Sequence, residues 1–110
     1  MGARLIRTVG TSGANTAQTV NTPAEGPLLL LFVTCKYSAA PTQAGVTVTL
    51  NSGVGAAYDA ELNAGSANAQ TTVYAPTGRI IIAPDDVLDV LAPAGGAGIT
   101  STIAIYTRPA

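Results

Sequence analysis

The sequence contains no histidine, no tryptophan and only one cysteine in 110 residues. Without histidine the chain cannot build Ser-His or Cys-His pairs, imidazole acid-base groups or His metal sites. A single cysteine forms neither an intrachain disulfide nor a thiolate metal cluster. These absences exclude most familiar catalytic mechanisms. We therefore predict that the protein is not an enzyme and uses no cofactor.

Charge is also scarce, because Lys, Arg, Asp and Glu make up 10% of the residues and the formal net charge is -1. Nucleic-acid binding depends on a basic patch, which this composition does not supply, and a membrane-surface role loses support for the same reason. The longest apolar run, residues 28–33, is far shorter than the roughly 20 residues of a membrane span. The first seven residues have no signal-peptide pattern. We expect neither nucleic acid nor membrane as a partner.

Cys35 lies at the end of an apolar segment, which predicts a buried strand residue. A reactive thiol needs a cationic neighbour, and although Lys36 is adjacent in sequence, consecutive strand residues point to opposite faces. The run 28–33 is apolar at both odd and even positions. This pattern predicts a central strand that is covered on both faces.

Apolar residues at every second position indicate β-strands along most of the chain. In residues 45–50, Val46, Val48 and Leu50 would face one side and two threonines the other, and residues 99–107 repeat the alternation. Turn residues separate about eight such segments, which is typical of an all-β sandwich or barrel. The segments are 3–9, 27–37, 45–50, 55–62, 70–75, 78–82, 87–91 and 99–107. We predict an all-β fold with a single antiparallel β-sandwich domain over residues 1–110.

Residues 10–25 are polar, small and almost uncharged, and they contain too few apolar residues to fold alone. We predict a polar loop or arm here, with a short irregular strand at 17–21 as the alternative, and expect the sandwich to fold without residues 11–22. Such a segment can pair with an exposed strand edge of a partner through its main chain. The candidate interface residues in it are Thr11, Asn15, Gln18 and Asn21.

A second candidate interface is the segment that contains Tyr58, Asp59 and Glu61. The two acidic residues alternate, so in a strand they would share one face. Glycosidases use paired carboxylates, but the chain has no Trp and few aromatic residues to line a sugar subsite. A solvated or interface face is therefore the favoured interpretation.

Asp85, Asp86 and Asp89 form the only local concentration of charge. Their spacing does not match a calcium-binding loop, which distributes its oxygen ligands over a longer segment. We favour a turn at residues 84–86 in which an acidic side chain caps backbone amides. A cation site is the alternative.

Much of the chain resembles small β-sandwich virion proteins of tailed bacteriophages. The resemblance is carried by residues 37–53, which run from Tyr37-Ser38-Ala39-Ala40-Pro41 to Asn51-Ser52-Gly53, by 56–59, and by the later segments 84–90 and 94–100. The family often has Gly-Asp where this chain has Asp85-Asp86, and we expect a different turn at that point. The resemblance implies a jelly-roll-like sandwich and a role as a capsid decoration or cement protein.

On this basis we expect a non-enzymatic virion component that binds the assembled capsid in many copies and stabilises it. Its partners would be the major capsid protein and further copies of itself, most simply as a trimer. It would be made in the host cytoplasm and be located on the capsid exterior. The alternative is a receptor-binding or carbohydrate-binding module of a tail or fibre, which the lack of clustered aromatic residues disfavours.

Overall fold

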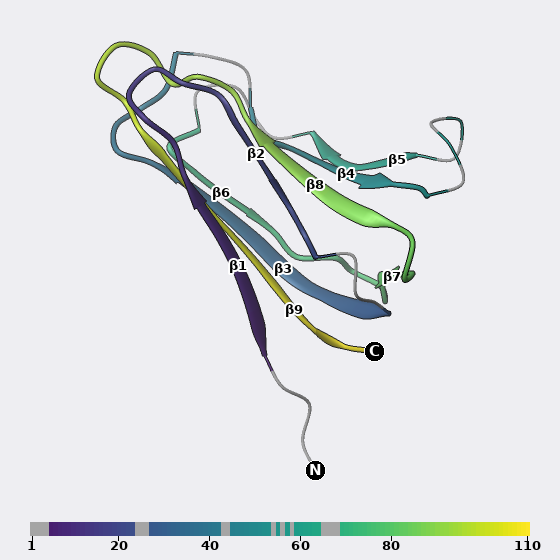
Figure 1. Ribbon diagram of the computed structural model, residues 1–110. Coiled ribbons are helices and arrows are strands. Elements are labelled where there is room, and N and C mark those ends of the chain that lie inside the picture. The colour runs from purple at the N-terminus through teal and green to yellow at the C-terminus, as the bar shows by residue number, and fades with distance from the viewer. Residues whose placement is uncertain are drawn as a thin grey trace.

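A computed structural model describes residues 5–23, 27–42, 45–53, 55, 57, 59–64 and 69–110 of the chain (Figure 1). These residues form nine strands and no helix. The strands are β1 (Ile6–Thr11), β2 (Gln18–Asn21), β3 (Leu28–Tyr37), β4 (Thr47–Asn51), β5 (Ala60–Ala64), β6 (Thr71–Tyr74), β7 (Ile81–Ile82), β8 (Val87–Ala92) and β9 (Ser101–Pro109).

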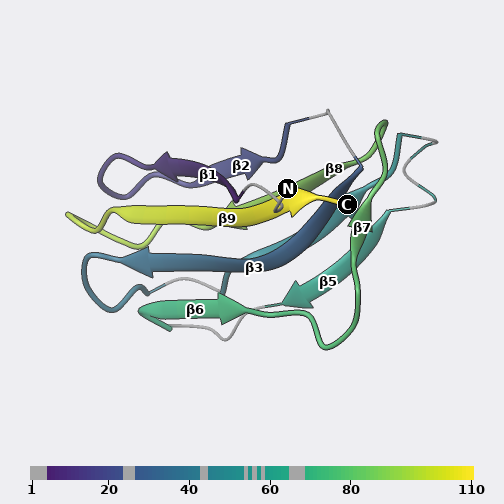
Figure 2. The same cartoon turned by 90° about the horizontal axis from the view of Figure 1, so that it is seen from below.

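The strands form two antiparallel sheets that pack against each other (Figures 1 and 2). The first sheet has the order β1-β9-β3-β6, and β7 pairs with the end of β3 that β6 leaves free. The second sheet has the order β2-β8-β4-β5. The chain crosses repeatedly between the two sheets in the order of a jelly roll. The predicted all-β antiparallel sandwich is confirmed, with jelly-roll strand order.

The core lies between the sheets and follows the alternation of the sequence. Val46 and Val48 are buried from one sheet, and Ile103 and Ile105 from the other. Leu50 and Ile99 pack against the same cluster at its margin, as the alternation predicted. Threonines and other polar residues take the outward positions of these strands, because successive side chains point to opposite faces.

Strand β3 is central in its sheet, with β9 on one side and β6 and β7 on the other. Its register with β9 shifts between Leu30 and Phe32, so the inward positions change parity at this bulge. Leu28 and Leu30 face the core before the shift. From Val33 to the end of the strand, every second residue faces the core. The bulge explains in part why the run is apolar at both parities. The expectation that a second layer covers both faces is not met, because the other sheet covers only the inner one.

Within the segment 10–25, the described residues 10–23 do not form the expected loop or arm, and residues 24 and 25 lie outside the described residues. Gly10 and Thr11 complete β1, a turn follows, and β2 (Gln18–Asn21) pairs along its whole length with β8. The alternative of a short strand is therefore correct. Val20 packs in the core, and the Thr22 hydroxyl accepts a hydrogen bond from the Leu88 amide at 2.9 Å. Because these contacts belong to the sandwich itself, we now expect deletion of residues 11–22 to destabilise the fold, contrary to the expectation from the sequence.

A buried polar cluster joins the β1–β2 turn to the start of β9. The Ser12 amide donates to the Ser101 carbonyl oxygen, and the Ser101 amide donates to the Ser12 hydroxyl, both at 2.9 Å. The Gln18 side-chain amide donates to the Ser101 carbonyl oxygen and to its hydroxyl, at 3.1 and 2.9 Å. These bonds satisfy polar groups that would otherwise be buried without partners.

Candidate functional site

The outer face of the first sheet, which we call the A face, has no layer over it formed by the described residues (Figure 2). Strand alternation and burial define its members, which come from five strands. They are Arg7, Val9, Thr11, Phe32, Thr34, Lys36, Thr71, Val73, Ile81, Thr102, Ala104, Tyr106 and Arg108.

Register places these residues in rows across the sheet. One row contains Val9, Ala104, Thr34 and Val73, from four neighbouring strands. Val9 and Val73 keep 60% and 62% of their surface exposed. Ile81, on β7 at the same edge of the sheet, is 42% exposed. The fold thus leaves three large apolar side chains uncovered on this face.

Two aromatic rings stabilise the middle of the A face. Phe32 and Tyr106 are register partners on β3 and β9, and their rings stack with centroids 4.3 Å apart and planes 21° apart. Both side chains are half-buried although they point away from the core. The stacked pair keeps this part of the face ordered, because an aromatic pair restricts both side chains to one geometry.

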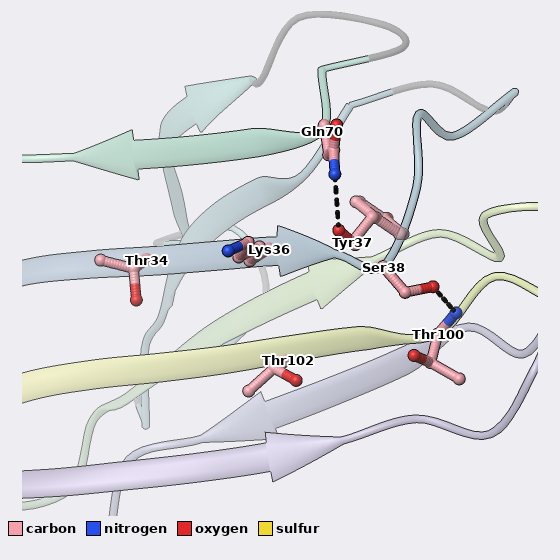
Figure 3. Close-up of a pocket in the computed structure, with 7 residues that line it drawn as sticks. All are labelled: Thr34, Lys36, Tyr37, Ser38, Gln70, Thr100 and Thr102. Carbon is pink, nitrogen blue, oxygen red and sulfur yellow. Dashed lines mark hydrogen bonds between the residues drawn. The ribbon is translucent and has the colours of Figure 1, made fainter.

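A shallow polar hollow of about 580 Å³ lies at the end of the A face, where β3 ends and β9 begins (Figure 3). Its lining residues carry hydroxyl, amide and ammonium groups. They are Thr34, Lys36, Tyr37, Ser38, Gln70, Thr100 and Thr102. Lys36 is exposed and supplies the only charge of this lining.

Hydrogen bonds hold the walls of this hollow in place. The Ser38 amide donates to the Thr100 carbonyl oxygen at 2.9 Å, and the Thr100 amide donates to the Ser38 hydroxyl at 3.0 Å. On the other side, the Tyr37 amide donates to the Gln70 carbonyl oxygen at 2.8 Å, and the Gln70 side chain donates back at 3.4 Å. The hollow is therefore formed by ordered backbone before any ligand arrives.

The outer face of the second sheet, which we call the B face, is more polar than the A face. Its members are Thr19, Asn21, Thr47, Thr49, Asn51, Glu61, Val87, Asp89 and Leu91. One row across all four strands contains Asn21, Asp89, Thr49 and Glu61. Leu91, which is 41% exposed, lies two residues from Asp89 on the same side of β8. The B face thus carries two carboxylates beside an exposed apolar side chain.

Acidic side chains at the end of the sandwich beyond β4 and β8 hold loop backbone. Asp86 accepts a hydrogen bond from the Gly53 amide at 2.9 Å, and Asp59 accepts one from the Ser52 amide at 2.8 Å. The predicted turn at residues 84–86 is present, but the amide that Asp86 binds belongs to the segment after β4 and not to the backbone before β8. The described residues contain no group of three or more His, Cys, Asp or Glu residues arranged to hold a metal ion.

The structure does not bring the predicted interface residues into one patch. Thr11 lies on the A face, whereas Asn21 and Glu61 share a row of the B face. Asp59 is exposed in the segment before β5, and Tyr58 lies outside the described residues.

Asn15 and Gln18 contact other parts of the chain with their side chains. Asn15, at a positive φ of 50°, accepts a hydrogen bond from the Gly96 amide at 3.1 Å, and so ties the β1–β2 turn to the β8–β9 turn. Gln18 belongs to the buried cluster around Ser101. The sequence did not identify the A face, because its members come from strands that are far apart along the chain.

Cys35 is buried in the core with 1% of its surface exposed, as predicted. Burial raises the pKa of its thiol from the ordinary value of 9.0 to about 11. Burial also raises the pKa of the neighbouring Tyr37 hydroxyl, and the Cys35 thiolate charge adds to that shift. Tyr37 donates its hydroxyl hydrogen to the Pro93 carbonyl oxygen at 2.7 Å. Both groups serve packing and do not form a nucleophilic site.

No protein-family model, curated protein or solved structure matches this chain. In the part of the chain that the structure describes, no helix is long and apolar enough to cross a membrane.

Proposed function

We propose that this chain is a non-enzymatic structural protein of a bacteriophage virion, which binds the outside of the assembled capsid in many copies and stabilises it. The observation that supports this proposal is the A face, an ordered sheet face whose exposed valines and isoleucine no described part of the chain covers. Such a face functions by contact with another protein. The resemblance of residues 37–107 to small β-sandwich virion proteins suggests the major capsid protein as that partner.

The mechanism follows from mass action. A protein that binds only the assembled shell favours assembly by the free energy of its own binding. Each copy contributes a modest contact, and repetition over the shell adds these contacts together. Contacts between copies would hold neighbouring sites together. The protein would be made in the host cytoplasm and be located on the capsid exterior.

The side-chain chemistry also favours a structural role over catalysis. The most closely packed hydroxyl pair, Ser12 and Ser101, is bonded to backbone groups and to Gln18, with no general base beside it. Asp59 and Asp86 accept hydrogen bonds from loop amides. The isolated protein should therefore show no turnover of ester, phosphate or glycoside substrates. Turnover that persists through repeated purification would contradict this expectation.

The proposal is tested by adding the purified protein to particles of the encoding phage that were assembled without it. We expect saturable binding to assembled particles, no binding to unassembled capsid subunits, and a higher temperature of capsid disruption after binding. Equal binding to free subunits, or no change in disruption temperature at saturation, would contradict a stabilising role on the shell.

A second candidate function is the receptor-binding or carbohydrate-binding module of a tail or fibre. The observation that favours it is the hydroxyl-lined hollow around Lys36, whose polar groups suit a hydrated ligand. No aromatic ring of the hollow is exposed for a sugar to stack on, since the Tyr37 ring is buried. Binding of the protein to whole host cells, abolished by soluble cell-surface glycan, would favour this function over capsid decoration.

A further inference from the structure

The two outer faces of the sandwich carry charges of opposite sign. Among the described strands, the cations Arg7, Lys36 and Arg108 all lie on the A face. The carboxylates Glu61 and Asp89 both lie on the B face. The net charge of -1 conceals this separation. Opposite fields on opposite faces orient two copies so that unlike faces meet.

The cations of the A face have no partner of their own. Arg7, Lys36 and Arg108 make no hydrogen bond or ion pair within the described chain, and neither does Glu61 on the B face. Asp89 accepts a hydrogen bond from the Asn51 side chain at 3.1 Å and keeps its charge. These charges are therefore available for an intermolecular contact.

Each face also has an exposed apolar side chain near one of its charges. On the A face, Lys36 lies one row from Val73, which is largely exposed on the neighbouring strand β6. On the B face, Asp89 lies beside the exposed Leu91. Each face thus offers a charge next to an apolar side chain, and the hollow around Lys36 leaves room for an incoming side chain. Burial of apolar surface would supply affinity and the charges would supply orientation.

We propose that copies of this chain associate head to tail, with the A face of one copy covering the B face of the next. Pairing of two A faces would place cations against cations, and pairing of two B faces would place carboxylates against carboxylates, so both symmetric arrangements are disfavoured. A contact between unlike faces forms a closed ring when the rotation between copies divides a full turn, and an open chain otherwise. Because the A and B faces lie on opposite sides of the sandwich, copies joined in this way form an open stack rather than a trimeric ring, and the copy at one end keeps its A face for the capsid surface.

Sedimentation of the isolated protein over a range of concentration and salt tests this inference. We expect reversible association that weakens about tenfold between low and high salt, because screening acts on exposed charges. Lys36→Glu on the A face and Glu61→Lys on the B face should each weaken association by about tenfold, since each replaces an attraction by a repulsion. An equimolar mixture of the two variants should associate again, because it contains one unaltered face of each kind.

Two control variants test whether the loss of association depends on charges of the two faces and not on any exposed charge. Arg79→Glu reverses one exposed cation in the connection between β6 and β7, and Asp85→Lys reverses one exposed carboxylate in the turn before β8. Neither should change association. The inference is overturned if the wild-type protein stays monomeric at low salt, if the controls weaken association as much as the face variants, or if the mixture fails to associate. Particle binding by a monomeric protein would overturn this inference while leaving the proposed function intact.

Discussion

The hydroxyl of Ser12 accepts hydrogen bonds from both the amide and the hydroxyl of Ser101, at 2.9 and 3.0 Å, although 89 residues separate the two serines. Ser101 is buried at the start of β9, and Ser12 lies in the turn after β1. The pair therefore fixes the turn between β1 and β2 on β9, the last strand of the fold. It also explains why a segment with the composition of a loop is part of the sandwich.

Replacing Ser12 by alanine should destabilise the fold. The change leaves the Ser101 amide and hydroxyl without their acceptor in a buried site, which costs about 1–3 kcal/mol. Urea unfolding followed by circular dichroism measures the loss. Thr16→Ala is the matched control, because Thr16 is exposed and bonds only to the nearby Ala14 carbonyl oxygen. A Ser12→Ala protein as stable as the control would contradict a structural role for the pair.

A second stability prediction concerns Thr107, whose hydroxyl oxygen is fully buried and has no hydrogen-bond partner in the described chain. Valine has nearly the same shape and no polar group to desolvate, so Thr107→Val should raise the free energy of unfolding by about 1 kcal/mol. Thr102→Val, at an exposed position of the same strand, is the control and should change stability little. A destabilised Thr107→Val protein would show that the hydroxyl has an unrecognised partner.

The raised pKa of Cys35 predicts how stability depends on pH. The folded thiol keeps its proton up to a pH of about 11, whereas the unfolded thiol loses it near 9.0. The unfolded state therefore binds fewer protons between these values, and stability should fall as pH rises from about 9 to 11. Tyr37 contributes in the same direction. Urea midpoints at several pH values, compared with those of Cys35→Ala, measure the effect. An identical decline in both proteins would exclude Cys35 as its source.

The same burial predicts that the Cys35 thiol is protected from reagents. In the folded protein at pH 8, labelling by a thiol-specific reagent should be slower than in urea by several orders of magnitude, because only an opened molecule exposes the thiolate. Lys36→Cys places a thiol at the next, exposed position and should react at once. Rapid labelling of wild-type Cys35 under native conditions would contradict its place in the core.

Strand alternation was sufficient to predict the fold class and much of the core. The residues predicted to face the core in segments 46–50 and 99–107 do so, because each of these strands has one apolar face and one polar face. The β3 bulge was not predictable, since a run of leucines has no polar residue to mark the change of parity. The sequence also did not decide between a loop and a strand at β2, because β2 pairs with β8, which is far away in the sequence.

The candidate site was predictable only in part. The sequence indicated a partner interface in residues 10–25 and in the acidic segment 58–61. In the structure, several side chains of the polar and acidic segments bind backbone amides of turns and loops instead. The A face could not be seen, because Arg7, Lys36 and Arg108 are isolated in the sequence and become one face only when β1, β3 and β9 pair. Separation of charge between faces is a property of register, which a single sequence does not reveal.

The copy number of the protein in purified virions tests the central claim most directly. Quantitative mass spectrometry, with the major capsid protein as the internal standard, gives the number of chains in each particle. We predict on the order of hundreds of copies, removed together with the outer layer of the shell by treatments that leave capsid subunits assembled, as repeated contacts on a capsid exterior require. A handful of copies that stay with isolated tails, or none in the particle, would contradict the account.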